Sequence, residues 1–210
     1  MRHTSLCRDL VVINSSRVAG IVFACATFFL SACTTAPPRQ ADTAVPTSEQ
    51  PFAIDGRLSA KRGSEGAAAN FAWNHDVGRD RIDFASPLGQ VYARIDGNND
   101  RIVVERPGGA TETYPDWRSM TVALLGAPVP MDDLSFWIRG AARAGTPVSV
   151  ERDAQSRVLV LRQREWEIVY SYPDNASAAL PSRIFLKQQG SETVEVRIVV
   201  DRWGATLAAP

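Results

Sequence analysis

Apolar and polar residues alternate one by one along most of the chain from Phe52 onward. Such alternation is typical of a β-strand with one buried face and one face in water. Clear runs lie at 52–61, 67–73, 82–84, 91–95, 102–104, 166–172, 184–186 and 194–200. Turn sequences such as RGSEG, NHDVG, DGNND, RPGG and PDNAS separate them, so most connections are expected to be hairpins. With several weaker runs, the pattern predicts a mainly β fold, an antiparallel meander of about 11 strands.

Residues 115–145 interrupt this alternation with helical spacing. Asp116 can cap a first helix, and Gly126 is placed to end it. The apolar face of this helix would carry Trp117, Met120, Thr121 and Leu124. A second, shorter helix is expected from Asp132 to just before Gly140. Its buried face would carry Leu134, Trp137 and Ile138. In an otherwise β chain, these two helices are expected to lie across the sheet or to close the mouth of a barrel.

A long antiparallel meander has two edges to protect, and closure into a curved barrel is a common solution. A barrel of this size can hold a ligand. Its aromatic side chains can equally fill a solid core. The alternation alone does not decide between these two interiors.

The N-terminal segment has the layout of an export signal. Three arginines precede the apolar run Val18–Leu30, which is shorter than the roughly 20 apolar residues of a membrane-spanning helix. The run ends in Leu30-Ser31-Ala32-Cys33, which resembles the bacterial lipobox. In a lipobox the cysteine is lipidated and becomes the new N-terminus. An ordinary signal peptide with an incidental cysteine is the alternative.

The lipobox divides the chain into four parts. Residues 1–32 are expected to be a cleaved lipoprotein signal peptide, and residues 33–51 a lipidated cysteine with a proline-rich, flexible tether. Residues 52–204 form the β-barrel domain, and residues 205–210 a C-terminal tail. Cys33 would carry a diacylglyceryl group and an N-acyl chain. Since cleavage removes the other cysteines, Cys7 and Cys25, the mature chain cannot form an intramolecular disulfide.

The charge balance gives no sign of a nucleic-acid partner. The chain has 23 basic and 23 acidic residues, and residues 1–32 contain three arginines and one aspartate. The mature protein is therefore slightly acidic, without the basic surface that nucleic acid requires. The same balance argues against a polybasic second membrane anchor.

The mature chain lacks the residue patterns of common enzymes. Its single histidine, His75, falls in the turn sequence NHDVG, where we expect it to decorate a loop. The sequence contains no G-x-S-x-G elbow, no P-loop and no Cys-x-x-Cys or His-x-x-x-His pair. The neighbouring acids Asp132 and Asp133 are expected to stabilise a helix start. We therefore expect no catalytic residues, no metal site and no cofactor beyond the lipids on Cys33.

One turn carries an unexpected side chain. Ser86-Pro87-Leu88-Gly89 lies between two alternating runs and reads as a tight turn, yet it presents a leucine where turns normally face water. From the turn alone, we expect this leucine to fold back against its own hairpin or a neighbouring loop.

Several motifs in one order are similar to those of a known family. They are GRLSA (56–60), FAW (71–73), SPLG (86–89), LLGAPVP (124–130), LSFWIRG (134–140), WEIVYSY (166–172), LPSRIFL (180–186) and Trp203. Behind a lipobox, these motifs resemble the LolB family of outer-membrane lipoprotein receptors, which take lipoproteins from the periplasmic carrier LolA. The sequence departs from the family pattern at Gln90, at PMDDL in the lid segment and in the tail after Trp203.

The resemblance implies an incomplete, strongly curved antiparallel β-barrel of 11 strands, covered by a short helical lid over an apolar acyl-chain cavity. Leu88, with Pro87 and Gly89, aligns with a turn that passes lipoproteins into the membrane, so its leucine is expected to be exposed. The large alternating and lid side chains are the candidate cavity residues. They are Phe71, Trp73, Phe84, Trp117, Leu124, Trp137, Trp166, Ile168 and Tyr170.

The same resemblance implies partners and a location. The expected partners are LolA, lipoprotein cargo and outer-membrane lipid, and the protein is expected to be a monomer. Thr34, directly after the lipidated cysteine, is compatible with residence at the periplasmic face of the outer membrane. A lipid-anchored binding module for a small hydrophobic ligand or a free lipid remains the alternative, because it would share the fold without needing the carrier.

Overall fold

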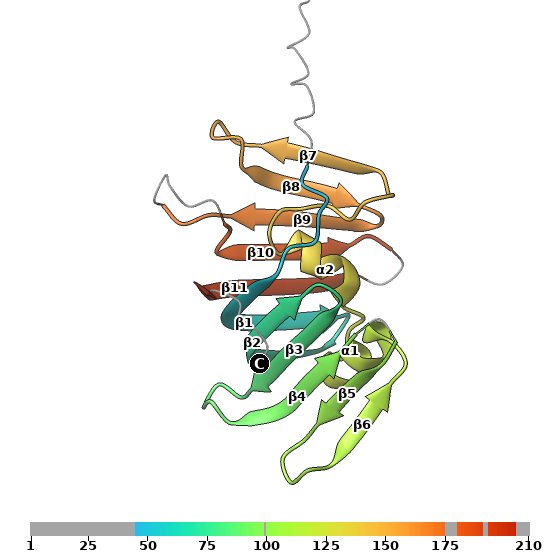
Figure 1. Ribbon diagram of the computed structural model, residues 1–210. Coiled ribbons are helices and arrows are strands. Elements are labelled where there is room, and N and C mark those ends of the chain that lie inside the picture. Colours follow the sequence, from blue (N-terminus) through green and yellow to red (C-terminus); the bar gives the residue numbers. More distant parts are fainter. Residues whose placement is uncertain (1–44, 99, 175–179, 191–192, 205–210) are drawn as a thin grey trace, which may run out of the picture. The chain divides into compact units, whose positions relative to one another are not determined.

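A computed structural model describes residues 45–98, 100–174, 180–190 and 193–204, all within a unit that spans residues 42–210 (Figure 1). The strands are β1 (Phe52–Arg62), β2 (Glu65–Asp76), β3 (Arg79–Ala85), β4 (Val91–Gly97), β5 (Ile102–Glu105), β6 (Thr111–Tyr114), β7 (Val148–Arg152), β8 (Val158–Gln163), β9 (Trp166–Ser171), β10 (Arg183–Gln188) and β11 (Val194–Gly204). The helices are α1 (Trp117–Leu125) and α2 (Met131–Trp137). The mainly β fold, its 11 strands and the two helices between β6 and β7 confirm the prediction.

All strands form one antiparallel sheet in the order β6-β5-β4-β3-β2-β1-β11-β10-β9-β8-β7. Every neighbouring pair except β1–β11 is consecutive in sequence, so the sheet consists of two meanders joined by the first and last strands. The end strands β6 and β7 are not neighbours, and the strand direction turns along the sheet (Figure 1). The sheet is therefore open, as an incomplete barrel requires.

Alternation along the strands gives the sheet one apolar inner face. On β2, for example, Phe71 and Trp73 are buried whereas Ala72 and Asn74 are only half-buried. The inner residues of the other strands and the buried faces of both helices belong to the same apolar cluster. Burial of each large apolar side chain contributes about 1.5–3 kcal/mol, so this single layer supplies most of the driving force for folding.

Helix α1 begins and ends where the sequence predicts. The Asp116 carboxylate accepts a hydrogen bond from the backbone N–H of Ser119 at 2.7 Å, which satisfies one of the free N–H groups of the first turn. Gly126 ends the helix in the left-handed conformation, with φ of 69°. The buried face differs slightly from the prediction, because Leu125 is buried and Leu124 only half-buried.

Helix α2 is held to the sheet by buried polar groups. Gln163 on β8 accepts hydrogen bonds from the Trp137 indole N–H at 2.9 Å and from the Arg143 backbone N–H at 3.0 Å. Its amide nitrogen donates to the Arg143 carbonyl at 2.7 Å and to the Thr146 hydroxyl at 2.8 Å. The Tyr170 hydroxyl on β9 donates to the Trp137 carbonyl at 2.8 Å. Burial raises the pKa of this phenol well above its usual value, so it remains a neutral donor.

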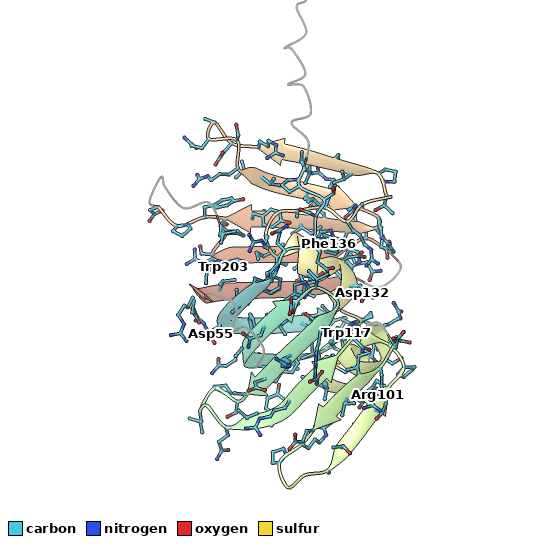
Figure 2. The ribbon with its side chains drawn as sticks, in the orientation of Figure 1. Asp55, Arg101, Trp117, Asp132, Phe136 and Trp203 are labelled. Carbon is cyan, nitrogen blue, oxygen red and sulfur yellow. The ribbon has the colours of Figure 1, made fainter. Side chains whose placement is uncertain are left out.

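Both helices contact the inner face of the sheet. Trp117 of α1, labelled in Figure 2, lies against Gly97 of β4, where any side chain would run into the indole ring. Trp137 of α2 lies beside Trp166 of β9, with ring centroids 6.2 Å apart. In the described part of the chain, no helix is long and apolar enough to cross a membrane.

We predict that Gly97→Ala destabilises the fold by about 1–3 kcal/mol, because the added methyl group overpacks the buried Trp117 ring. Gly204→Ala is the matched control: an added Cβ there makes only ordinary contacts, the nearest at 3.8 Å from Ala53. Urea denaturation measures both free energies of unfolding. Equal stability of the two variants would show that α1 adjusts freely to the change.

Candidate functional site: an exposed leucine beside an apolar layer

The turn between β3 and β4 is held by its own backbone. The Gly89 N–H donates to the Ser86 carbonyl at 2.8 Å, and the Ser86 N–H donates to the Gln90 carbonyl at 2.9 Å. Gly89 adopts φ of 84°, a conformation that favours glycine. Pro87 restricts φ at the first central position. These constraints leave Leu88 at the tip of a well-defined turn.

Leu88 points into solvent. The residue is 92% exposed, compared with 63% for Val77 and less than 40% for the other exposed large apolar residues of the described chain. The leucine therefore does not fold back against its hairpin, contrary to the expectation from the turn alone. An exposed isobutyl group on a short turn can enter an apolar phase without any rearrangement of the domain.

The base of this turn is braced by aromatic and polar contacts. Phe84 and Tyr92 stack with ring centroids 6.4 Å apart, next to a register shift between Phe84 and Ala85. The Asn70 side-chain amide on β2 donates to the Ser86 carbonyl at 3.2 Å. Because neighbouring strands support both arms of the hairpin, contact at its tip acts on the domain as a whole.

The structure brings all nine candidate cavity residues into one layer between sheet and helices. Phe71 and Trp73 lie on β2, Phe84 on β3, Trp166, Ile168 and Tyr170 on β9, Trp117 and Leu124 on α1 and Trp137 on α2. All are buried except Leu124, which is half-buried against the same cluster. In this arrangement the side chains contact one another across the layer, so a ligand would have to displace the helices to enter it.

An open recess lies elsewhere on the domain. It has a volume of about 560 Å³ at the β1–β2 hairpin and is lined by Lys61, Arg62, Gly63, Ser64, Glu65, Thr193 and Glu195. These residues are mainly polar and charged. The recess is therefore a poor environment for acyl chains, and the inner layer is the better candidate for them.

The structure corrects the expectation for His75. This histidine lies on β2, not in a loop, and is 1% exposed. Its Nδ1 lies 2.7 Å from Asp80 Oδ1 on β3, and its Nε2 lies 3.2 Å from Glu49 Oε1. One signal in the sequence indicates this position: His75 continues the inward row that Phe71 and Trp73 begin. Sequence reasoning missed it because NHDVG has the composition of a turn.

The neighbouring acids Asp132 and Asp133 occupy the first turn of α2, as predicted. Asp133 is 5% exposed and lies 3.5 Å from Arg143 and 3.6 Å from Arg164. Burial raises the pKa of Asp132, and the nearby Arg143 guanidinium opposes this shift. Within the described ranges, no group of three or more His, Cys, Asp or Glu residues is placed to hold a metal ion. Cys33 and Thr34 lie outside these ranges.

Comparison with known proteins places this chain in a family. A family model described as "Outer membrane lipoprotein LolB" matches residues 50–203. The outer-membrane lipoprotein LolB of Cupriavidus metallidurans is 30% identical over 201 residues, covering 90% of this chain and 98% of that protein. The LolB of Chromobacterium violaceum is 31% identical over 163 residues, covering 74% and 82%.

A solved structure adds a distant likeness. A LolA superfamily protein from Nitrosomonas europaea superposes with a TM-score of 0.45 at 10% identity, covering 79% of this chain and 90% of that one. The family model spans nearly all of the described domain, and the 30% identical relative covers almost the whole chain. The protein therefore belongs to the LolB family of outer-membrane lipoproteins.

Proposed function

We propose that this protein is an outer-membrane lipoprotein receptor that accepts lipoproteins from the carrier LolA in its apolar layer and inserts them into the outer membrane through the Leu88 turn. The observation that carries the proposal is the 92% exposure of Leu88 at the tip of an ordered turn, in a chain of the LolB family. The protein itself is anchored at the periplasmic face through lipids on Cys33.

An apolar layer meets the main energetic requirement of this task. At about 0.8 kcal/mol per CH₂, a dozen exposed methylenes cost on the order of 10 kcal/mol per acyl chain in water. Side chains such as Trp166 and Ile168 on β9 supply apolar surface of the required kind, and α1 and α2, which contributes Trp137, cover it. Acyl chains that replace the contacts between helices and sheet would remain shielded from water.

Transfer needs no energy source in the domain if affinity increases from carrier to receptor to bilayer. The final step needs the receptor to meet the bilayer with its acyl chains near the surface. Burial of one exposed leucine is worth about 1.5–3 kcal/mol, which favours a membrane encounter without making it permanent. Leu88 is suited to that step, because no other side chain has to move before it enters the lipid.

Crosslinking to a lipoprotein-loaded carrier tests the proposal. A LolB receptor is expected to crosslink with loaded LolA and to take over its lipoprotein. A binding module for a free lipid or a small hydrophobic ligand is expected to bind an apolar dye but not the carrier. Absence of both carrier crosslinking and dye binding would contradict both functions.

We predict that Leu88→Glu folds normally and accepts lipoprotein from the carrier but delivers it poorly to liposomes, because a carboxylate does not enter the bilayer. Val77→Glu is the matched control. It places the same charge at an exposed valine in the turn between β2 and β3, at the opposite end of β3 from the Leu88 turn. Transfer of radiolabelled lipoprotein measures delivery, and urea denaturation is expected to show changes within about 0.5 kcal/mol for both. Wild-type delivery by Leu88→Glu would contradict the role of this turn.

We predict that Cys33→Ser releases the mature protein from membranes while the domain keeps part of its transfer activity, because the sheet and helices provide the binding surface. Membrane fractionation and the same transfer assay check both statements. Retention of the variant in the outer-membrane fraction would show that another segment anchors the protein.

A further inference from the structure

The segment directly before β1 is bound to the domain. Residues 45–51, which we call the strap, lie within the part of the chain that the sequence assigns to the tether. Val45 packs against the apolar core, and the Pro46 carbonyl accepts a hydrogen bond from the Ala142 backbone N–H at 2.9 Å. Figure 1 shows this blue segment beside α2 on its way to β1. The strap thus contacts the loop that follows α2.

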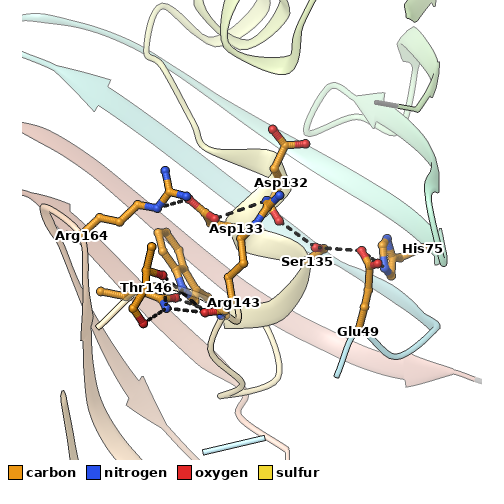
Figure 3. A network of polar contacts seen from close by, with 10 residues as sticks. Glu49, His75, Asp132, Asp133, Ser135, Arg143, Thr146 and Arg164 are labelled. Carbon is orange, nitrogen blue, oxygen red and sulfur yellow. Dashed lines mark hydrogen bonds and ion pairs between the residues drawn. The ribbon is translucent and has the colours of Figure 1, made fainter. Parts of the chain in front are cut away.

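Glu49 connects the strap to two further elements. Its Oε1 lies 3.2 Å from Nε2 of His75 on β2 and 3.5 Å from the hydroxyl of Ser135 on α2. Figure 3 shows Glu49 between these two side chains. Strap, helix and sheet therefore meet at a single carboxylate.

His75 is fixed from its other side. Asp80 Oδ1 accepts a hydrogen bond from the Trp73 indole at 2.6 Å and lies 2.7 Å from His75 Nδ1. The His75 ring also stacks on Phe52, with ring centroids 4.9 Å apart. Only Glu49 belongs to a segment outside the sheet, so it is the member of this cluster that can leave without disturbing the strands.

An attractive contact between Glu49 and His75 needs a proton on one of the two groups. Because an ionised Asp80 can only accept hydrogen bonds, Nδ1 of His75 carries a hydrogen. In a neutral imidazole, Nε2 would then present a lone pair to the Glu49 carboxylate, and the two groups would repel each other. The contact lacks the geometry of a directed hydrogen bond, so its attraction is that of opposite charges. A positively charged His75 between two carboxylates satisfies both contacts.

Other charged groups surround this cluster. A cavity of about 100 Å³ lies between strap and α2, lined by Glu49, Gly78, Asp80, Asn98, Asp132, Ser135, Phe136 and Arg143. Arg143 is the single cation of this lining, and it also approaches Asp133 at 3.5 Å. Carboxylates therefore outnumber cations among the residues that line this cavity.

We propose that the strap is a proton-dependent latch, in which charged His75 holds Glu49 and thereby keeps α2 on the sheet. The docked strap binds one more proton than the released strap, so docking strengthens as the pH falls and weakens as it rises. The other histidine of the chain, His3, lies in the predicted signal peptide. The interpretation of α2 as a lid over acyl chains rests on the proposed function. The latch between Glu49 and His75 does not depend on that function.

Hydrogen exchange of backbone amides tests the latch. The probes are the Ala142 amide, bonded to Pro46, and the Ile138 amide, bonded to Leu134 at the end of α2. Measurements use the lipidated protein in detergent from about pH 5 to 8, corrected for the pH dependence of intrinsic exchange. In the wild type, exchange of both amides is expected to accelerate as the pH rises.

Three variants separate the possible causes. Glu49→Ala is expected to accelerate exchange of both amides about tenfold near pH 5, as for loss of a partly buried ion pair. In Glu49→Gln, the side-chain amide can donate to neutral Nε2, so exchange is expected to stay slow and independent of pH. Gln50→Ala, an exposed neighbour whose side chain contacts Ser48, is the matched control and is expected to behave as the wild type.

The outcomes of the two proposals are distinguishable. Unchanged exchange in Glu49→Ala, or faster exchange at Ala142 alone, would overturn the latch. Faster exchange at both amides supports it, whether or not the protein binds an apolar dye. Absence of dye binding in both the wild type and Glu49→Ala would instead contradict the acyl-chain layer of the proposed function.

Discussion

The pairing of β1 with β11 is the interaction on which the rest of the structure depends, because it joins two meanders into one sheet broad enough to carry both helices. Gly56 lies at a register shift in this pair, where any side chain would run into the Val199 carbonyl. Ion pairs between Arg57 and Asp201 and between Arg202 and Asp55 follow the outer side of the same strands. Exposed pairs of this kind contribute little stability. The backbone hydrogen bonds between β1 and β11 and the close approach at Gly56 therefore set the register of this pair. The exposed ion pairs contribute little to it.

The two helices are attached to this sheet by different kinds of contact. Helix α1 is held by shape, with Trp117 filling the space that Gly97 leaves. Helix α2 is held by fully bonded polar groups at its C-terminal end, where Gln163 contacts Trp137 and the following loop. Breaking these buried bonds leaves unsatisfied groups, which is costly. The contact between Ser135 and Glu49 is longer, at 3.5 Å, and involves the strap, which lies outside the sheet. A movement of α2 that leaves its C-terminal end in place therefore breaks fewer hydrogen bonds than release of the whole helix.

Much of this fold is predictable from sequence because period-two alternation and helical spacing are local signals. They identify the strands and both helices, and Asp116 and Gly126 mark the bounds of α1. The contacts around Glu49 are not predictable in this way, since its partners come from two distant segments, β2 and α2, and the strap has the composition of a flexible linker. The inward row on β2 indicates that His75 is buried, but the turn residues around it conceal this. The exposure of Leu88 depends on how one short turn is directed, which alternation does not specify.

A single exposed leucine also suits the reversible contact with a bilayer that we propose for the Leu88 turn. Its burial, worth about 1.5–3 kcal/mol, shifts the balance between free and inserted turn by roughly ten- to hundredfold. A larger apolar patch would hold the domain at the surface and also promote association between copies of the protein. The hydrogen bonds of the turn fix the backbone beneath Leu88, so insertion costs little further conformational entropy. A rigid turn with one apolar side chain would thus allow frequent, short encounters, as the proposed delivery requires.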